Sequence, residues 1–340
     1  MNKKVYFYTR NTNSPGVTII LNSIVRSLLP YGIEGHIIDN IDNISRNELV
    51  IPYGTYECYE LLKTSHSKEL ALLVDYYSYG CLNKIFFYLK RLKLNYKDFY
   101  YSIISYLRYG FKDLKVAKSY AKVMMVSLSD IQKLTKKTNN STYLLCKNCV
   151  KIQERDFRPY NGTPIKLGII AHWTFISVDE TRWFIDDVFS KLRLHYPNIE
   201  LVIAGRGNAK IAERYFNKDG VKFIGEVSRL DDFFDNIDIY VATVPKGCGI
   251  LNKLLDAFSY KVFSIGIKPS FSAFSDLRNG YLICETIKEY ENAIWIYMNK
   301  PDEVQRIVNN AYNYVLEFHT DEEKNYESIV KTIVRALQSS

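Results

Sequence analysis

Residues 237–256 read IDIYVATVPKGCGILNKLLD, and this stretch decides the fold of the chain. The apolar residues at 237–241 predict a short buried strand, and the leucine-rich end predicts a helix from about Ile250. Between them, Gly247 and Gly249 allow the backbone to approach a ligand closely. The unpaired N–H groups at a helix start favour an anion such as a diphosphate. The stretch therefore predicts one strand–loop–helix unit of an α/β protein, although a helix after a glycine-rich turn needs no ligand.

Units of the same kind recur along the whole chain. Apolar runs alternate with helical stretches, which is typical of parallel sheets. The polar segment 151–164 contains two prolines and predicts a linker. Because 340 residues favour two domains, we expect domains at 1–150 and 165–318 and a C-terminal helix at 319–340. The predicted strands are 5–8, 36–39, 49–51, 70–74, 123–126, 143–145, 167–170, 201–204, 221–224, 237–241, 262–265 and 282–284.

Two helices in the second half carry a start signal. Ser228 is followed three residues later by Asp231, and Thr286 is followed in the same way by Glu289. This is the spacing of a capping box, in which the two side chains satisfy backbone N–H groups of the first turn. We therefore expect a helix to begin at each point.

The helix predicted from Ile250 carries polar groups on one face. Asn252 and Lys253 lie in its first turn, where a lysine opposes the helix dipole unless an anion is close. Asp256 is seven residues beyond Gly249, and at about 3.6 residues per turn it shares a face with that glycine and with Lys253. A carboxylate at this distance from an anion can accept hydrogen bonds from ribose hydroxyls. The pattern indicates a site for a nucleoside diphosphate group.

Four segments of the second half resemble motifs of one enzyme family. The segment 248–259 reads CGILNKLLDAFS and is similar to the R/T-G-I-x-N-K-x-L-E-A-M-A motif of retaining family-4 glycosyltransferases of the two-domain GT-B fold. Upstream, 177–184 (SVDETRWF), 201–207 (LVIAGRG) and 221–227 (VKFIGEV) resemble three further motifs of that family in the same order. The resemblance implies two Rossmann-like domains facing a cleft, with C-terminal helices that pack back toward the N-terminal domain.

The resemblance also implies a role for each residue of the helix start. The diphosphate of a nucleotide-sugar would lie at Gly249, Asn252 and Lys253, and Asp256 would bind the ribose. Where the wider family often has a carboxylate near the transferred sugar, this chain has Cys248.

Four other residues are candidates for the cleft. Arg206 follows a predicted strand, and its guanidinium suits phosphate oxygens, although a surface ion pair is the alternative. Trp173 would lie near the base or the cleft, with core packing as its alternative. Asp75 ends an apolar strand, so it is expected to orient or deprotonate the acceptor hydroxyl, unless it caps a helix. His172 is a second polar candidate for this catalytic role.

The first half of the chain is basic and aromatic. The net charge is +8, and residues 84–137 hold 13 Lys and Arg against 3 Asp and Glu. Residues 76–111 contain 13 Tyr and Phe. Such a composition is compatible with nucleic acid, with an anionic membrane surface, or with an ordinary helix pair that has a solvated basic face. Given a nucleotide-sugar site, we expect a membrane surface and a lipid-pyrophosphate-linked saccharide, and no nucleic acid.

The resulting expectation is a hexosyltransferase that uses a UDP- or GDP-sugar. It would act, with retention, in synthesis of a bacterial surface polysaccharide such as O-antigen. The N-terminus has no signal peptide, so we expect a cytoplasmic protein, free or peripheral at the inner face of the membrane. Neither a metal nor a cofactor is expected. A nucleotide-sugar epimerase of the same fold and an inactive nucleotide-sugar-binding subunit remain as alternatives.

Overall fold

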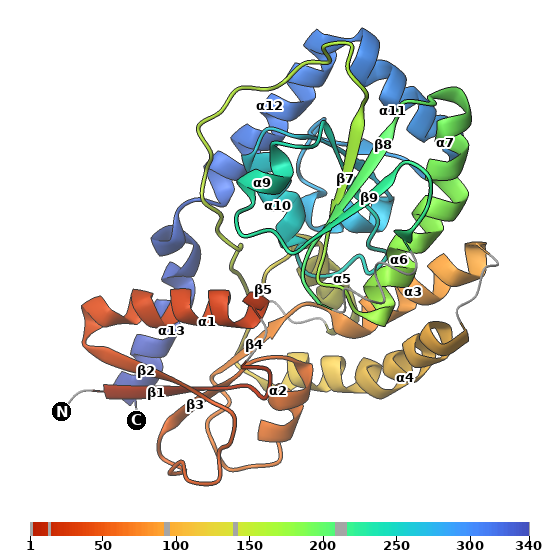
Figure 1. Cartoon of the computed structure of the whole chain (residues 1–340). Helices are drawn as coiled ribbons and strands as arrows, with labels where there is room; N and C mark the ends of the chain where they lie inside the picture. Colours follow the sequence, from red (N-terminus) through yellow and green to blue (C-terminus); the bar gives the residue numbers. More distant parts are fainter. Residues whose placement is uncertain (1–2, 13–14, 92–95, 139–141, 208–215, 340) are drawn as a thin grey trace.

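The computed structural model describes residues 3–12, 15–91, 96–138, 142–207 and 216–339. It contains two α/β domains, one above the other in Figure 1, each built on parallel strands. The predicted fold class is thereby confirmed. None of the described helices combines the length and the apolar character that a membrane crossing requires.

The first domain has two groups of three parallel strands, in the orders β2-β1-β3 and β4-β5-β6. A bridge between Tyr53 and Leu72 brings the edges of the two groups together. Its elements are β1 (Lys3–Tyr8), α1 (Pro15–Leu28), a 3-10 turn (Leu29–Tyr31), β2 (Ile33–Ile38), β3 (Leu49–Pro52), α2 (Thr55–Leu61), β4 (Leu70–Val74), α3 (Tyr77–Arg91), α4 (Tyr96–Ser119), β5 (Lys122–Met125), α5 (Leu128–Thr138) and β6 (Tyr143–Leu145).

The second domain has one sheet of six parallel strands, in the order β12-β11-β10-β7-β8-β9. The four inner strands β11, β10, β7 and β8 are apolar and mostly buried because helices cover both faces of the sheet, whereas the edge strands β9 and β12 are partly exposed. Its elements are β7 (Lys166–Ile170), α6 (Phe175–Phe184), a π-helical turn (Ile185–Phe189), α7 (Ser190–His195), β8 (Glu200–Ala204), β9 (Val221–Gly225), α9 (Asp231–Phe234), β10 (Ile239–Ala242), α10 (Asn252–Ser259), β11 (Phe263–Gly266), a 3-10 segment (Lys268–Phe274), β12 (Leu282–Ile283), α11 (Ile287–Asn299) and α12 (Pro301–Phe318).

The last helix, α13 (Glu322–Ser339), returns to the first domain and lies along α1 (Figure 1). Tyr326, Ile329, Val330 and Ile333 are buried in the core of the first domain. At about 1.5–3 kcal/mol for each fully buried apolar side chain, this contact ties the two ends of the chain together. The expected return of the C-terminal helices holds for α13, whereas α12 packs on α10 of its own domain.

A helix begins at both predicted points, but only one of them carries a capping box. Thr286 and Glu289 form the expected capping box at the start of α11. Ser228 caps nothing, because Leu230 occupies the N-cap position of α9 and no side chain accepts a hydrogen bond there.

Candidate active site

The largest described cavity near the predicted site has a volume of about 700 Å³ and lies between the domains. Its second-domain wall is formed by the loops after β7, β8 and β9 and by the start of α10. Gly16 and Ile19 of α1 face it from the first domain, and the segment 148–150 completes the wall. Of the residues predicted for the donor site, Arg206, Asn252, Lys253 and Asp256 line this cavity, as does His172.

The start of α10 gives the cavity its charge pattern. The N-cap position is held by Leu251, so no side chain satisfies the first N–H groups of the helix. Lys253 Nζ lies 3.3 Å from Asp256 Oδ2, and the Lys253 side chain is 38% exposed against 14% for Asp256. Burial raises the pKa of Asp256, and the neighbouring ammonium opposes that rise. A cation therefore stands at the mouth of the cavity and a carboxylate deeper in its wall.

Asn252 is fixed by a contact with the segment that joins the domains. Its Oδ1 accepts a hydrogen bond from Nδ2 of Asn148 at 2.7 Å. The carbonyl of Asn148 is in turn 2.6 Å from Nδ1 of His319, and the N–H of Val150 donates to the carbonyl of His319. The side chain of Asn252, which was predicted to contact the phosphate, is thus held in place by a hydrogen bond from outside α10. The sequence did not indicate this hydrogen bond.

Arg206 and His172 are exposed on the cavity wall, but Trp173 is not part of it. The Trp173 side chain is only 2% exposed and packs edge-on against Phe216 and Phe223. Its indole N–H donates to the carbonyl of Ala204. The prediction that Trp173 contacts the donor is therefore corrected: the side chain is buried in the core of the second domain, against Phe216 and Phe223.

Asp75 lies in an adjoining cavity of about 300 Å³, in contact with the loop before α10. Its Oδ2 accepts a hydrogen bond from Nζ of Lys246 at 2.6 Å and is 4.0 Å from Sγ of Cys248. Val74, just before it, has φ of 71°, a costly conformation for a β-branched residue. The N–H of Asp75 donates to the carbonyl of Leu73, which closes a γ-turn. This turn ends β4 and aims Asp75 at the second domain.

The position of Gly249 differs from its prediction. It lines the cavity of Asp75 and not the larger one, and its N–H donates to a carboxylate of the first domain. Its φ is +64°, and a Cβ placed there would lie 3.0 Å from Cβ of Asp75. The glycine therefore permits the close approach of the two domains, and its N–H is not directed at the donor cavity.

Lys246 is a charged residue of this region that the sequence did not single out. Although burial alone would lower the pKa of its ammonium, Asp75 and other neighbours raise it well above its ordinary value. Burial raises the pKa of the Cys248 thiol, so it stays uncharged at neutral pH. The only sequence signal for Lys246 was a cation in a glycine-rich loop after a strand.

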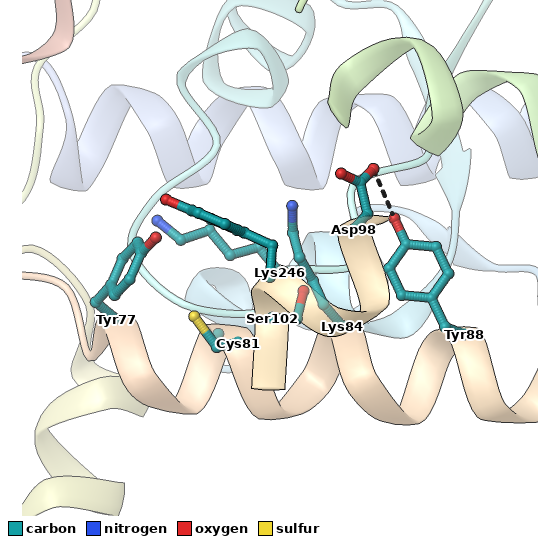
Figure 2. A pocket seen from close by; sticks show the side chains of 9 residues that line it. Tyr77, Cys81, Lys84, Tyr88, Asp98, Ser102 and Lys246 are labelled. Carbon is teal, nitrogen blue, oxygen red and sulfur yellow. Dashed lines mark hydrogen bonds between the residues drawn. The ribbon is translucent and has the colours of Figure 1, made fainter. Parts of the chain in front are cut away.

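A third, small cavity of about 60 Å³ continues beyond Lys246 between α3 and α4 (Figure 2). Figure 2 shows Tyr77, Cys81 and Lys84 on α3, with Lys246 reaching over them from the loop. The ammonium of Lys246 lies 5.3 Å from the Tyr77 ring centroid. Because neighbouring cavities share lining residues, they form a series in which the Asp75 cavity lies between the other two.

Comparison with known proteins identifies the second domain. Residues 165–299 match the family model described as Glycosyl transferases group 1. Over these residues the second domain is similar to that family. No curated protein sequence matches the chain.

Comparison with solved structures covers nearly the whole chain. Sucrose-phosphate synthase from Thermosynechococcus elongatus superposes with a TM-score of 0.65 at 12% identity, covering 99% of this chain and 98% of that one. HepE from Anabaena in complex with UDP gives a TM-score of 0.62 at 11% identity, covering 98% and 100%. TarM of S. aureus gives 0.58 at 14% identity, and this chain spans 57% of its length. At these identities the likeness establishes the GT-B fold.

Proposed function

We propose that this glycosyltransferase transfers a hexose from a UDP- or GDP-sugar to a saccharide acceptor, with retention of configuration. The observation that carries the proposal is the 700 Å³ cavity at the start of α10, where Lys253, Asn252 and Asp256 lie together. Its volume falls in the usual range for a small-molecule site.

The charge pattern of this cavity fits a nucleoside diphosphate. The first turn of α10 offers N–H groups without a side-chain cap, and Lys253 adds a full positive charge beside them. Arg206 faces the same space and can bind two phosphate oxygens. Asp256 lies on the same face of α10 and can accept hydrogen bonds from ribose hydroxyls. The HepE structures, solved with UDP and with UDP-glucose, support a uridine nucleotide as one of the two candidates.

Transfer would take place in the adjoining cavity, at Asp75. There the bond from the sugar C1 to the departing phosphate breaks, and the acceptor oxygen bonds to C1. The acceptor proton passes to the departing phosphate, with Asp75 orienting the acceptor hydroxyl. Lys246 would offset negative charge that develops on the leaving group. Cys248 replaces a carboxylate that the wider family often has near the transferred sugar. The carboxylate of Asp75 lies 4.0 Å from the sulfur of Cys248, so this part of the cleft still contains a carboxylate.

A lipid-linked acceptor is supported by the outer face of α4. Tyr100, Ile104, Leu107 and Phe111 recur at helical spacing, and between 42% and 70% of each is exposed. Several Lys and Arg side chains belong to the same helix. Aromatic and apolar groups among cations suit an anionic membrane interface. WaaG, another GT-B neighbour, is described as a glycosyltransferase of lipopolysaccharide biosynthesis, which supports a bacterial surface-polysaccharide setting.

The test of donor and acceptor is nucleotide release. The protein is incubated with UDP- and GDP-hexoses, with and without lipid-pyrophosphate-linked saccharides, and free nucleotide is measured. We expect release that depends on the acceptor, together with an α-linked product from an α-linked donor. Donor binding without release under any condition would instead support the inactive subunit that Cys248 suggests. Absence of any nucleotide binding would overturn the proposal.

Membrane docking is tested with vesicles of phosphatidylglycerol and phosphatidylcholine. Leu107→Asp places a charge on the proposed membrane face, and we expect binding to these vesicles to fall about tenfold. Leu194→Asp is the matched control, because Leu194 of α7 is 76% exposed but lies in the other domain. Equal binding of both variants would contradict docking through α4.

A further inference from the structure

The carboxylate of Asp130 connects the two domains beside the proposed transfer site. Asp130 lies in the first turn of α5 and is completely buried. Its Oδ2 accepts two backbone hydrogen bonds, from the N–H of Tyr76 at 3.2 Å and from the N–H of Gly249 at 2.7 Å. Tyr76 directly follows Asp75, whereas Gly249 belongs to the loop of the second domain. One carboxylate oxygen thus joins the two segments that meet at the transfer site.

Ordinary helix capping does not account for this arrangement. The hydroxyl of Ser127 accepts the N–H of Asp130 at 3.4 Å, so Ser127 takes the capping role at the start of α5. The hydrogen bonds that Asp130 accepts come from outside its own helix. Its Oδ1 has no hydrogen-bond partner among the described residues, although the ammonium of Lys133 is 3.8 Å away.

Burial of this carboxylate is costly, which argues that its geometry matters. Burial raises the pKa of Asp130 to about 6, while the N–H of Gly249 and the Lys133 ammonium oppose the rise. The negative charge of Asp75 also raises it. A buried anion without a full set of partners is destabilising. Against this cost, the buried carboxylate of Asp130 provides the hydrogen bonds to the N–H groups of Tyr76 and Gly249.

We propose that Asp130 is a positioning residue for transfer, which holds the Asp75 segment against the Gly249 loop. This inference rests on the proposed function. Asp130 does not line the donor cavity, so it would affect the rate of transfer and not the affinity for the nucleotide. A displacement of about 1 Å between reacting groups is enough to lower a rate by about a hundredfold.

The test compares Asp130→Ala, which removes both contacts, with Asp130→Asn, whose amide oxygen can still accept them. UDP and GDP affinity is measured by titration, and turnover by acceptor-dependent nucleotide release. We expect Asp130→Ala to lose at least about tenfold in turnover with nucleotide affinity unchanged within about twofold. Asp130→Asn should recover most of the lost turnover.

The matched control is Asp113→Asn. Asp113 is equally buried, and its pKa is also raised to about 6 by burial, but its partners Thr55 and Ser78 both belong to the first domain. We expect this variant to keep wild-type turnover below its melting temperature. Wild-type turnover by folded Asp130→Ala would overturn the inference, as would equal losses in the Asp130→Asn and Asp130→Ala variants.

Hydrogen exchange of the wild-type protein tests the Gly249 contact, on which the inference rests, if the alanine variant does not fold. The Gly249 amide should exchange slowly without any ligand, because Asp130 accepts it in a buried setting. Fast exchange of that amide would overturn the inference. This measurement needs no substrate, so it remains informative even if no nucleotide-sugar is turned over and the proposed function fails.

Discussion

The Lys253–Asp256 and Asp75–Lys246 ion pairs lie in neighbouring cavities but are built differently. The first joins residues three apart on one helix, and its geometry follows from the α-helix itself. The second joins residues 171 apart on two domains, and it exists only while the domains are together. The difference teaches that the charged groups of the proposed donor site belong to one domain, whereas the proposed transfer site is a product of domain contact.

The largest expected effect separates transfer from binding. Asp75→Asn keeps the shape of the side chain but weakens its ion pair with Lys246, so turnover should fall about a hundredfold, or about 2.7 kcal/mol of activation free energy. UDP affinity, measured by titration, should stay within about twofold. A loss of UDP affinity as large as the loss of turnover would place Asp75 in the donor site and would contradict the separation of the donor and transfer sites.

His319 should make the domain connection sensitive to acid. Burial lowers the pKa of His319 to about 4 from an ordinary 6.5, although the hydrogen bond from Nδ1–H to the carbonyl of Asn148 opposes this fall. The buried Nε2 has no hydrogen-bond partner among the described residues. The pKa of His319 is lower in the folded protein than in the unfolded chain, so the folded protein favours the neutral imidazole. The stability that this contributes is present above pH 6.5 and is lost as the pH falls toward 4. Between pH 7 and pH 5 the contribution is about 2 kcal/mol.

The measurement for His319 is urea unfolding at pH 7 and pH 5. His319→Asn does not titrate, so its free energy of unfolding should fall by about 2 kcal/mol less than that of the wild type over this interval. An identical pH dependence in both proteins would show that His319 is not held neutral.

Lys253→Ala tests the donor side of the comparison. Loss of a charged phosphate contact should weaken UDP or GDP binding about tenfold, which is about 1.4 kcal/mol. Lys261→Ala is a matched control, since Lys261 follows the same helix and does not line the donor cavity. Unchanged affinity in Lys253→Ala would move the diphosphate away from the start of α10.

The smallest expected effect concerns the corrected residue, Trp173. Trp173→Phe removes one buried hydrogen bond to Ala204 and leaves a small gap, so the free energy of unfolding should fall by about 1–2 kcal/mol. Nucleotide affinity should not change, because the indole does not reach the cavity. A clear loss of affinity in a stable variant would restore Trp173 to the donor site.

The sequence predicted the parts of the molecule that depend on local pattern. Apolar runs marked the strands of both domains, and helical spacing placed Lys253 and Asp256 on one face of α10. The start of α10 is at Asn252, two residues after the predicted point, because Leu251 is still extended. The capping box at Thr286 was found because both partners lie within four residues.

Long-range contacts account for what the sequence did not predict. The partner of Asp75 is Lys246, and no spacing rule connects two residues on different domains. The same holds for Asn148 and Asn252. Whether Trp173 faced the cleft or the core depended on Phe216 and Phe223, which belong to later parts of the chain. Gly249 was predicted to let a ligand approach the backbone, but the group that approaches it is Asp75 of the other domain.

The most direct test of the comparison is hydrogen exchange with and without UDP and GDP. If the groups that bind the nucleotide belong to the second domain, nucleotide should slow exchange in residues 204–207 and 250–256. The helix hairpin at 77–91 and 96–119 should be unaffected. Protection confined to that hairpin, with none at 250–256, would contradict the account.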